Sequence, residues 1–153
     1  YKGASVTPVY EPVFLQINKL RQKVEAGAAF VQTQGIFDLD AFKRFLEQVD
    51  AAGIKTHIMA GVIPLKSAGM ARYMNENVPG IFVPQEMIDR LAAAAEEGKA
   101  KGVKGLPMKL GMEMAAEMIA KIKSEHLCDG VHIMAIGAEK NVPAILDFAG
   151  ITI

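Results

Sequence analysis

The chain has 153 residues, enough for one domain with a sizeable core, and its 17 basic residues are balanced by 17 acidic ones. A net charge of zero excludes a general electrostatic attraction to nucleic acid or to an anionic membrane surface, and the single cysteine, Cys128, excludes an intrachain disulfide. No apolar run reaches the roughly 18 residues of a membrane span and no Cys or His pair has metal-ligand spacing, so we expect a cytoplasmic domain without a metal.

Apolar periodicity predicts strands that alternate with helices along the chain. Residues 1–8 read as the end of a strand and the loop after it, so we expect that a preceding part of the protein is missing. The helices are expected over 13–26, 38–52, 67–74, 85–97, 107–125 and 142–148, the strands over 29–34, 55–63 and 130–136, and a basic, glycine-rich loop over 99–104. Such alternation indicates parallel strands joined by right-handed crossovers.

The end of the strand 29–34 is the most informative stretch. Gln32, Thr33 and Gln34 stand where a core strand would continue with apolar residues, and Asp38 is placed to cap the next helix. In parallel α/β proteins the carboxyl ends of strands are where ligands bind. An unpaired buried amide costs on the order of 1–3 kcal/mol, so we expect these groups to have a partner, either a ligand or a neighbouring strand.

Repeated strand–helix units favour a (β/α)8 TIM barrel over a dinucleotide-binding fold, because no G-x-G-x-x-G follows a strand. About four strands are present where a barrel needs eight, so we expect the chain to supply the C-terminal half of a barrel. His57 and His132 are expected to begin strands, at the end of a barrel that serves stability.

Several segments resemble one family in order and spacing. Residues 23–34 followed by Phe37-Asp38 are similar to the K-V-x-A-G-A-x-F-x-x-T-Q-x-x-F-D segment of methylenetetrahydrofolate reductases. Further similarity lies in residues 52–54, 61–64, 83–86, 111–113 and 131–132. The chain resembles the carboxyl-terminal half of that family's catalytic barrel.

This resemblance implies an enzyme of one-carbon metabolism and methionine biosynthesis that reduces methylenetetrahydrofolate to methyltetrahydrofolate. Hydride would pass through FAD from NADH, NADPH or another donor. Gln34 would bind the pterin of the folate substrate, Thr33 precedes it in the motif, and Met74 would pack on the bound ligand. The residues implied to contact FAD are Asn18, Lys19 and Lys23.

The chain also departs from the family pattern. Met134 and Ala138 replace a tyrosine and an arginine of the last strand, and that arginine meets the folate tail in relatives. The family's acidic proton-handling residues would lie upstream, so the catalytic residues are unknown and the chain alone is expected to be inactive.

Alternatives remain for these residues and for the whole chain. Gln34 could be an amide satisfied by loop backbone, and Lys19, Arg21 and Lys23 could form an ordinary solvated helix face. The chain could also be a non-catalytic half-barrel scaffold that docks onto another subunit. A half barrel leaves two strand edges unpaired, so we expect an oligomer or a complex with the missing half or with partner subunits.

Overall fold

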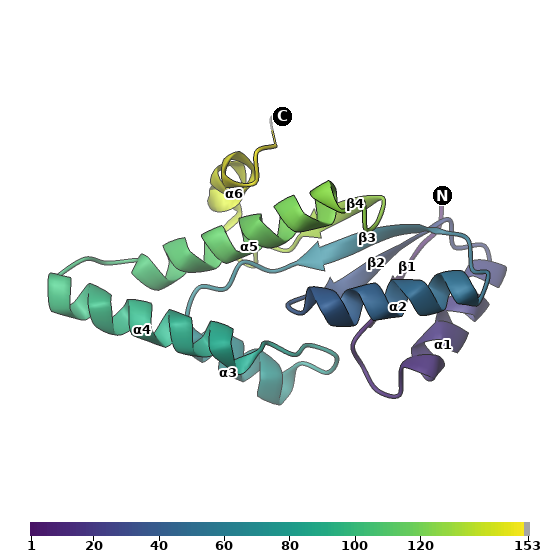
Figure 1. Ribbon diagram of the computed structural model, residues 1–153, viewed down its shortest axis with the longest axis horizontal. Helices are drawn as coiled ribbons and strands as arrows, with labels where there is room; N and C mark the ends of the chain where they lie inside the picture. Colours follow the sequence, from purple (N-terminus) through teal and green to yellow (C-terminus); the bar gives the residue numbers. More distant parts are fainter. Residues whose placement is uncertain (152–153) are drawn as a thin grey trace.

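Strands and helices alternate along the chain as predicted. The strands form a parallel sheet in which they follow one another in chain order (Figure 1). The computed structural model describes residues 1–151. The strands are β1 (Gly3–Val6), β2 (Phe30–Gly35), β3 (His57–Val62) and β4 (Gly130–Ile133), in the order β1-β2-β3-β4. All three neighbouring pairs are parallel, which confirms the predicted α/β class.

Helices occupy the segments in which apolar residues recur at helical spacing. They are α1 (Val13–Glu25), α2 (Leu39–Ala51), α3 (Ala68–Asn77), α4 (Gln85–Lys101), α5 (Leu106–Ser124) and α6 (Val142–Phe148), with a short 3-10 helix, η1 (Glu139–Asn141), before the last. Asp38 caps α2 as predicted, because its side chain accepts the main-chain N–H of Ala41. Among the helices of residues 1–151, none combines the length and the apolar character that crossing a bilayer requires.

Several boundaries differ from the prediction: α3 continues three residues beyond 74, to Asn77, and β3 begins at His57 and not at residue 55. The loop expected over 99–104 is shorter, because α4 continues to Lys101 and stops where Gly102 takes a left-handed φ of 65°. β4 ends at Ile133 and does not reach residue 136, since Ile136 has a φ of 44° that no strand accommodates. The carboxyl end of β4 therefore leads into an irregular loop.

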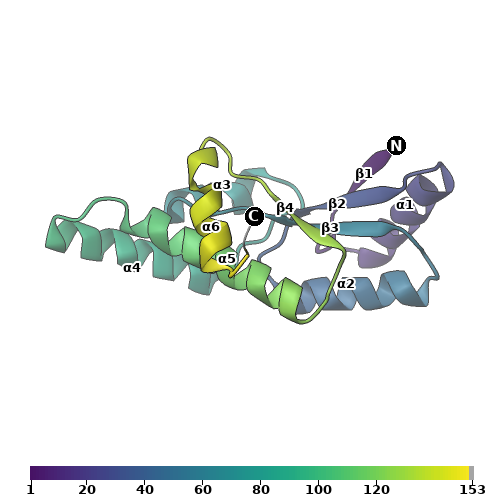
Figure 2. The same ribbon diagram turned by 90° about the horizontal axis from the view of Figure 1, so that it is seen from above.

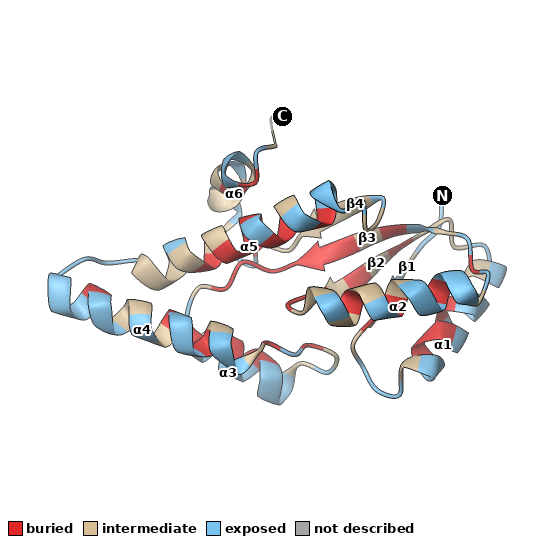
Figure 3. Ribbon diagram, viewed as in Figure 1, coloured by how far each residue is buried: buried red, intermediate tan, exposed pale blue. Residues whose placement is uncertain are grey.

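The main core lies between one face of the sheet and the helices α1, α2 and α5. Figure 2 shows α2 and α5 on the same side of β3 and β4, and Figure 3 shows buried residues where these helices meet the strands. Alternate strand residues point into this core, as the two-residue period of a strand requires. They include Val6, Val31, Ile58, Ala60 and Val62, with Val131 and Ile133 partly buried against them.

The strand residues that alternate with these core positions form the opposite face of the sheet. We use the name open face for six of these residues on β2, β3 and β4, namely Phe30, Gln32, Gln34, Met59, Gly61 and His132. All of these except Gly61 are partly exposed. A second apolar cluster begins beyond the carboxyl ends of the strands, where Phe37, Ile63 and Leu65 meet α3 and α4. The open face is thus bounded by apolar residues at its carboxyl end.

The amino-terminal end of the sheet is held by Asp129, which precedes β4. Its carboxylate accepts the main-chain N–H of Ile58 at 2.8 Å and contacts Nδ1 of His57 at 2.9 Å. These two interactions, the contact with His57 first, lower the pKa of Asp129. His57 begins β3 as predicted. The pair joins β3 to β4 at the end of the sheet opposite the strand tips.

We expect Asp129→Asn to destabilise the fold at neutral pH by no more than about 1 kcal/mol, because the carboxylate is half exposed. A carboxyl group whose pKa is lowered by folding contributes stability above its unfolded-state pKa and loses it as pH falls through the lowered pKa. The difference in urea midpoint between the variant and the unsubstituted protein should therefore shrink in acid. Asp147→Asn, on the exposed surface of α6, is the control. A midpoint difference that stays constant down to about pH 2 would contradict this role for Asp129.

Candidate functional site

A β-bulge interrupts the end of β2 at the residues that the sequence singled out. Gln32 pairs with Met59 and Gly35 pairs with Gly61, so two residues of β2 stand opposite one residue of β3. The hydroxyl of Thr33 fills the gap in the ladder. Its Oγ1 accepts the main-chain N–H of Gly61 at 2.8 Å and donates to the carbonyl of Gln34 at 2.8 Å.

Thr33 is therefore a structural residue of the bulge. It is only 4% exposed, and its hydroxyl has a partner in each direction. The resemblance implied a place for Thr33 beside the substrate, whereas the structure gives its side chain two protein partners. Thr33 would affect a bound ligand only indirectly, because it fixes the position of Gln34.

We expect Thr33→Val to destabilise the protein by about 1–3 kcal/mol, since the buried N–H of Gly61 loses its acceptor while the side-chain volume is kept. Thr33→Ser retains the hydroxyl and should therefore lose less stability than Thr33→Val. Urea unfolding of both variants measures the difference. Equal stability of the valine variant and the unsubstituted protein would show that the bulge does not depend on this hydroxyl.

Gln34 lies at the carboxyl end of the open face. Its Oε1 accepts the N–H of the next residue, Gly35, at 3.2 Å, and among the described residues its side-chain NH2 has no hydrogen-bond acceptor. Because an amide carries two N–H donors, both remain available to a ligand. The interpretation of Gln34 as an amide satisfied by loop backbone thus holds for its oxygen, and its role in binding a ligand stays a prediction. Local backbone satisfies the oxygen, and the nitrogen is open.

Gly61 lies between the bulged end of β2 and His132 on β4. In the sheet it pairs with Gly35 on one side and with His132 on the other. A Cβ atom at Gly61 would lie 2.4 Å from the carbonyl oxygen of Thr33, closer than real Cβ atoms come to other atoms. Glycine at this position therefore allows β3 to fit against the bulge.

His132 does not have the place that the sequence predicted for it. It is the third of the four residues of β4 and lies in register with Gly61, near the carboxyl end of the strand. Val131 and Ile133 pack against the main core, so alternation directs the imidazole to the open face. The apolar neighbours on both sides are the signal that could have identified it. His132 therefore joins the candidate site.

The helix residues that the resemblance assigned to FAD do not gather around Gln34. Asn18 and Lys19 are exposed on α1, and Nζ of Lys23 donates to the main-chain carbonyl of Ser5 on the edge strand β1. These three side chains form no cradle for a dinucleotide within the described residues.

Met74 is 6% exposed and belongs to the second apolar cluster. Its side chain packs within the protein, where the resemblance had placed it against a ligand. We therefore leave Met74 out of the residues proposed to touch a ligand. Met74 supports the second apolar cluster, at the carboxyl end of the open face.

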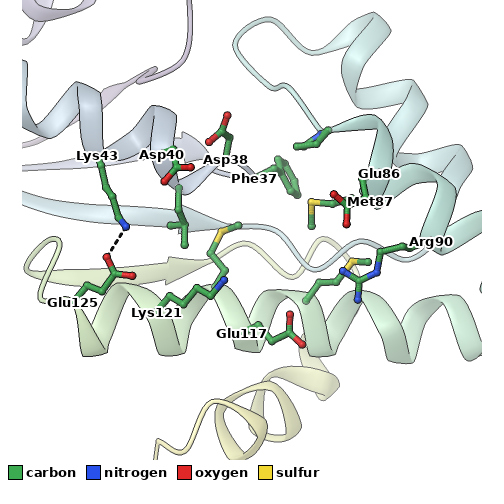
Figure 4. A pocket seen from close by; sticks show the side chains of 14 residues that line it. Phe37, Asp38, Asp40, Lys43, Glu86, Met87, Arg90, Glu117, Lys121 and Glu125 are labelled. Atoms are coloured by element: carbon green, nitrogen blue, oxygen red, sulfur yellow. Dashed lines mark ion pairs between the residues drawn. The ribbon is translucent and has the colours of Figure 1, made fainter.

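A separate groove of about 480 Å³ lies in the helix layer (Figure 4). Its lining comes from α2, α4 and α5 and from the segments that precede α2 and α4. Lys43 and Glu125 form an ion pair of 2.6 Å across one end of it, and this contact raises the pKa of Lys43. Side chains of both signs line the groove, and Met114 and Met118 line its apolar part.

We place the candidate site on the open face and not in this groove. Gln34 and His132 of the open face lie at or near the carboxyl ends of parallel strands, where ligands of such sheets bind. The polar side chains of the open face are uncharged amides and an imidazole, which suit a neutral ring with both donors and acceptors. Within residues 1–151, no group of three or more His, Cys, Asp or Glu side chains comes together as a metal-binding cluster.

One family profile and two relatives of this chain have the same description. The profile of the family described as methylenetetrahydrofolate reductase matches residues 6–150. Methylenetetrahydrofolate reductase 1 of Schizosaccharomyces pombe is 29% identical over 135 residues, which are 88% of this chain and 21% of the relative. The 5,10-methylenetetrahydrofolate reductase of Escherichia coli is 32% identical over 87 residues, which are 54% of this chain and 29% of the relative.

A solved structure is similar in fold. It is an uncharacterized protein from Clostridium thermocellum, described as binding two copies of 5-methyl-5,6,7,8-tetrahydrofolic acid. The TM-score is 0.64 at 14% identity, and the match covers 96% of this chain and 51% of that one. The chain thus spans about a fifth of the length of the fission yeast relative and half of the structural neighbour. Because the family profile covers nearly all of its residues, this chain belongs to the methylenetetrahydrofolate reductase family.

Proposed function

We propose that this chain supplies the folate-binding face of a methylenetetrahydrofolate reductase and forms the C-terminal half of a (β/α)8 barrel. Four parallel strands in chain order, with the core helices on one face, are what half of such a barrel would contain. The structural neighbour, of which this chain covers 51%, supports the same interpretation. The open face would then line the barrel interior, and β1 and β4 would pair with strands outside residues 1–153.

The observation that carries the proposal is the unpaired amide nitrogen of Gln34 at the bulged tip of β2, which has no acceptor among the described residues. A pterin ring presents acceptors and donors along one edge, and an amide NH2 donates to such acceptors. Thr33 fixes the main chain from which Gln34 projects, and the methyl carbon of Met134 lies over Gly61, 2.8 Å from where a Cβ atom would be. His132, two strands away, would border the ring on its other side.

The cofactor that the family implies is FAD, which supplies hydride to the bound substrate and is reduced by NADH, NADPH or another donor. Some relatives have NADPH or NADH in their names, among them one in Caenorhabditis elegans with NADPH and one in rice with NADH. The α1 residues of this chain do not by themselves form a site for FAD. We propose that the flavin is held mainly by parts of the protein outside these residues, and we assign no step of the reaction to this chain through it.

The role of this chain is to bind and orient the folate. The main-chain geometry of the bulge would hold the Gln34 amide in place before the ligand arrives, so less conformational entropy is lost on binding.

Purified protein that contains this chain tests the proposal. It should be yellow from bound flavin, and it should oxidise NADH or NADPH only when methylenetetrahydrofolate is present. The alternative is the scaffold function, which is favoured by the edge strands β1 and β4, each paired on one side only within residues 1–151. A colourless protein that binds a second chain and no folate would establish that alternative.

A further inference from the structure

At the carboxyl end of the sheet, the loop that follows β3 contacts the loop that follows β4. Nζ of Lys66 donates to the main-chain carbonyl of Ile136 at 2.7 Å. Ile136 has a left-handed φ of 44° and is 49% exposed, which is unusual for a β-branched residue. Next to it, the N–H of Gly137 donates to the carboxylate of Glu139 at 2.8 Å. The loop after β4 is thus held in a strained form, with Lys66 at its side.

The charges at this edge contrast with those of the open face. The open face carries amides, a methionine and an imidazole, and no carboxylate or ammonium group. Lys66 is a cation that bridges the loops at its carboxyl end. The pKa of Glu139 is lowered by main-chain N–H groups, its own and that of Gly137, and further by the charge of Lys66. Glu139 is therefore a carboxylate directed to the loop backbone, while Lys66 keeps two N–H donors without an acceptor among the described residues.

A folate has two chemically different ends. Its pterin ring is uncharged and suits the amide of Gln34, whereas its glutamate tail carries carboxylates. The contact between the β3 and β4 loops lies beyond the carboxyl ends of the two strands that follow β2 in the sheet, and neighbouring strands in a sheet lie about 4.8 Å apart. If the ring of an extended ligand were bound at Gln34, its tail would extend toward the loop that contains Lys66.

We propose that Lys66 binds the carboxylate tail of the folate and so selects ligands that carry this tail. This inference rests on the proposed function. A hydrogen bond from an ammonium group to a carboxylate is stronger than one to a neutral carbonyl, so the tail would replace the carbonyl of Ile136 as a partner of Lys66. Ala138, two residues further along, offers no charge for this purpose. Lys66 thus supplies the positive charge from the loop that follows β3.

The test compares two ligands on the full-length protein, 5-methyltetrahydrofolate and the tail-less 6-methyltetrahydropterin, by isothermal titration calorimetry. Lys66→Met should weaken 5-methyltetrahydrofolate about tenfold and leave the tail-less pterin unchanged, because only the tail loses its partner. Lys66→Arg should restore most of the affinity. Raising the salt concentration should weaken folate binding in the unsubstituted protein and have less effect in Lys66→Met. Lys140→Met, on the exposed part of η1, is the matched control and should bind both ligands normally.

The outcomes separate this inference from the proposed function. If the unsubstituted protein binds neither ligand, the proposed function fails. If it binds both and Lys66→Met leaves both affinities unchanged, or weakens both equally, the role of Lys66 is overturned and the proposed function stands. Thermal unfolding of Lys66→Met shows whether the loop contact also affects stability. If Lys66 only held the loops in place, the variant would lose affinity for the tail-less pterin as well.

Discussion

Replacing Gln34 by alanine in the full-length protein should lower kcat/KM for methylenetetrahydrofolate by more than about tenfold, which corresponds to roughly 1.4 kcal/mol of transition-state stabilisation. The substitution removes the side-chain N–H donors of Gln34, which have no acceptor among the described residues. It also frees the N–H of Gly35, which Gln34 now satisfies. Ring acceptors of the substrate would lose their partners in a site shielded from water, where an unpaired group is most costly.

The matched control is Gln32→Ala. Gln32 has the same side chain on the same face of the same strand, two residues earlier, and lies in register with Met59 before the bulge. We expect less than about a threefold effect there, because Gln32 is farther from the carboxyl end where ligands bind. Steady-state kinetics of both variants under identical conditions make the comparison. An unchanged kcat/KM for Gln34→Ala would remove this residue from the mechanism.

Gly111→Ala should be among the most destabilising single substitutions in the chain, by about 3 kcal/mol or more. A Cβ atom at Gly111 would lie 1.7 Å from the carbonyl oxygen of Leu65, and the obstacle is main chain that no rotamer change can move. Helix α5 therefore approaches the segment after β3 as closely as a glycine allows. Accommodating the methyl group requires α5 and this segment to move apart.

Gly69→Ala provides the control for this substitution. Gly69 lies inside α3, and a Cβ atom there would meet only Oγ of Ser67 at 3.7 Å, an ordinary contact. Alanine in a helix is favoured over glycine by about 0.5–1 kcal/mol, so this variant should be as stable as the unsubstituted protein or slightly more so. Urea unfolding measures both variants. A Gly111→Ala protein with an unchanged midpoint would show that the close approach of α5 is not required.

The Gly111 contact also bears on function. Leu65 precedes Lys66, whose side chain reaches the loop after β4. Moving α5 away from Leu65 would displace the lysine from the edge of the open face. We therefore expect that any folded fraction of Gly111→Ala binds 5-methyltetrahydrofolate less tightly than Gly69→Ala does.

The elements can be predicted from the sequence because their signals are local. Apolar residues at helical spacing locate every helix within a few residues, and the polar residues at the tip of β2 indicate a site by their chemistry alone. What cannot be predicted depends on pairing between distant residues. The bulge at Thr33 is defined by its register with β3, and the contact of Lys66 joins residues 70 positions apart. The prediction for His132 is wrong because β4 ends at Ile133, which puts this histidine near the carboxyl end of a strand that was expected to be longer.

The residues named from the family resemblance also differ in whether their side chains have partners within the protein. Gln34 has an open amide where the resemblance expected a ligand contact, whereas Met74 is buried and Lys23 is bonded to Ser5. The position of a residue in a motif does not specify which atoms of its side chain remain free. That information comes from the hydrogen bonds of the folded chain.

A crystal structure of the full-length protein with 5-methyltetrahydrofolate is the most direct measurement. We expect the pterin ring over the open face beside Gly61, with a ring acceptor about 2.7–3.2 Å from the side-chain nitrogen of Gln34. A ring bound in the groove between α2, α4 and α5, or anywhere that leaves the Gln34 amide without a ligand partner, would contradict the assignment of the site.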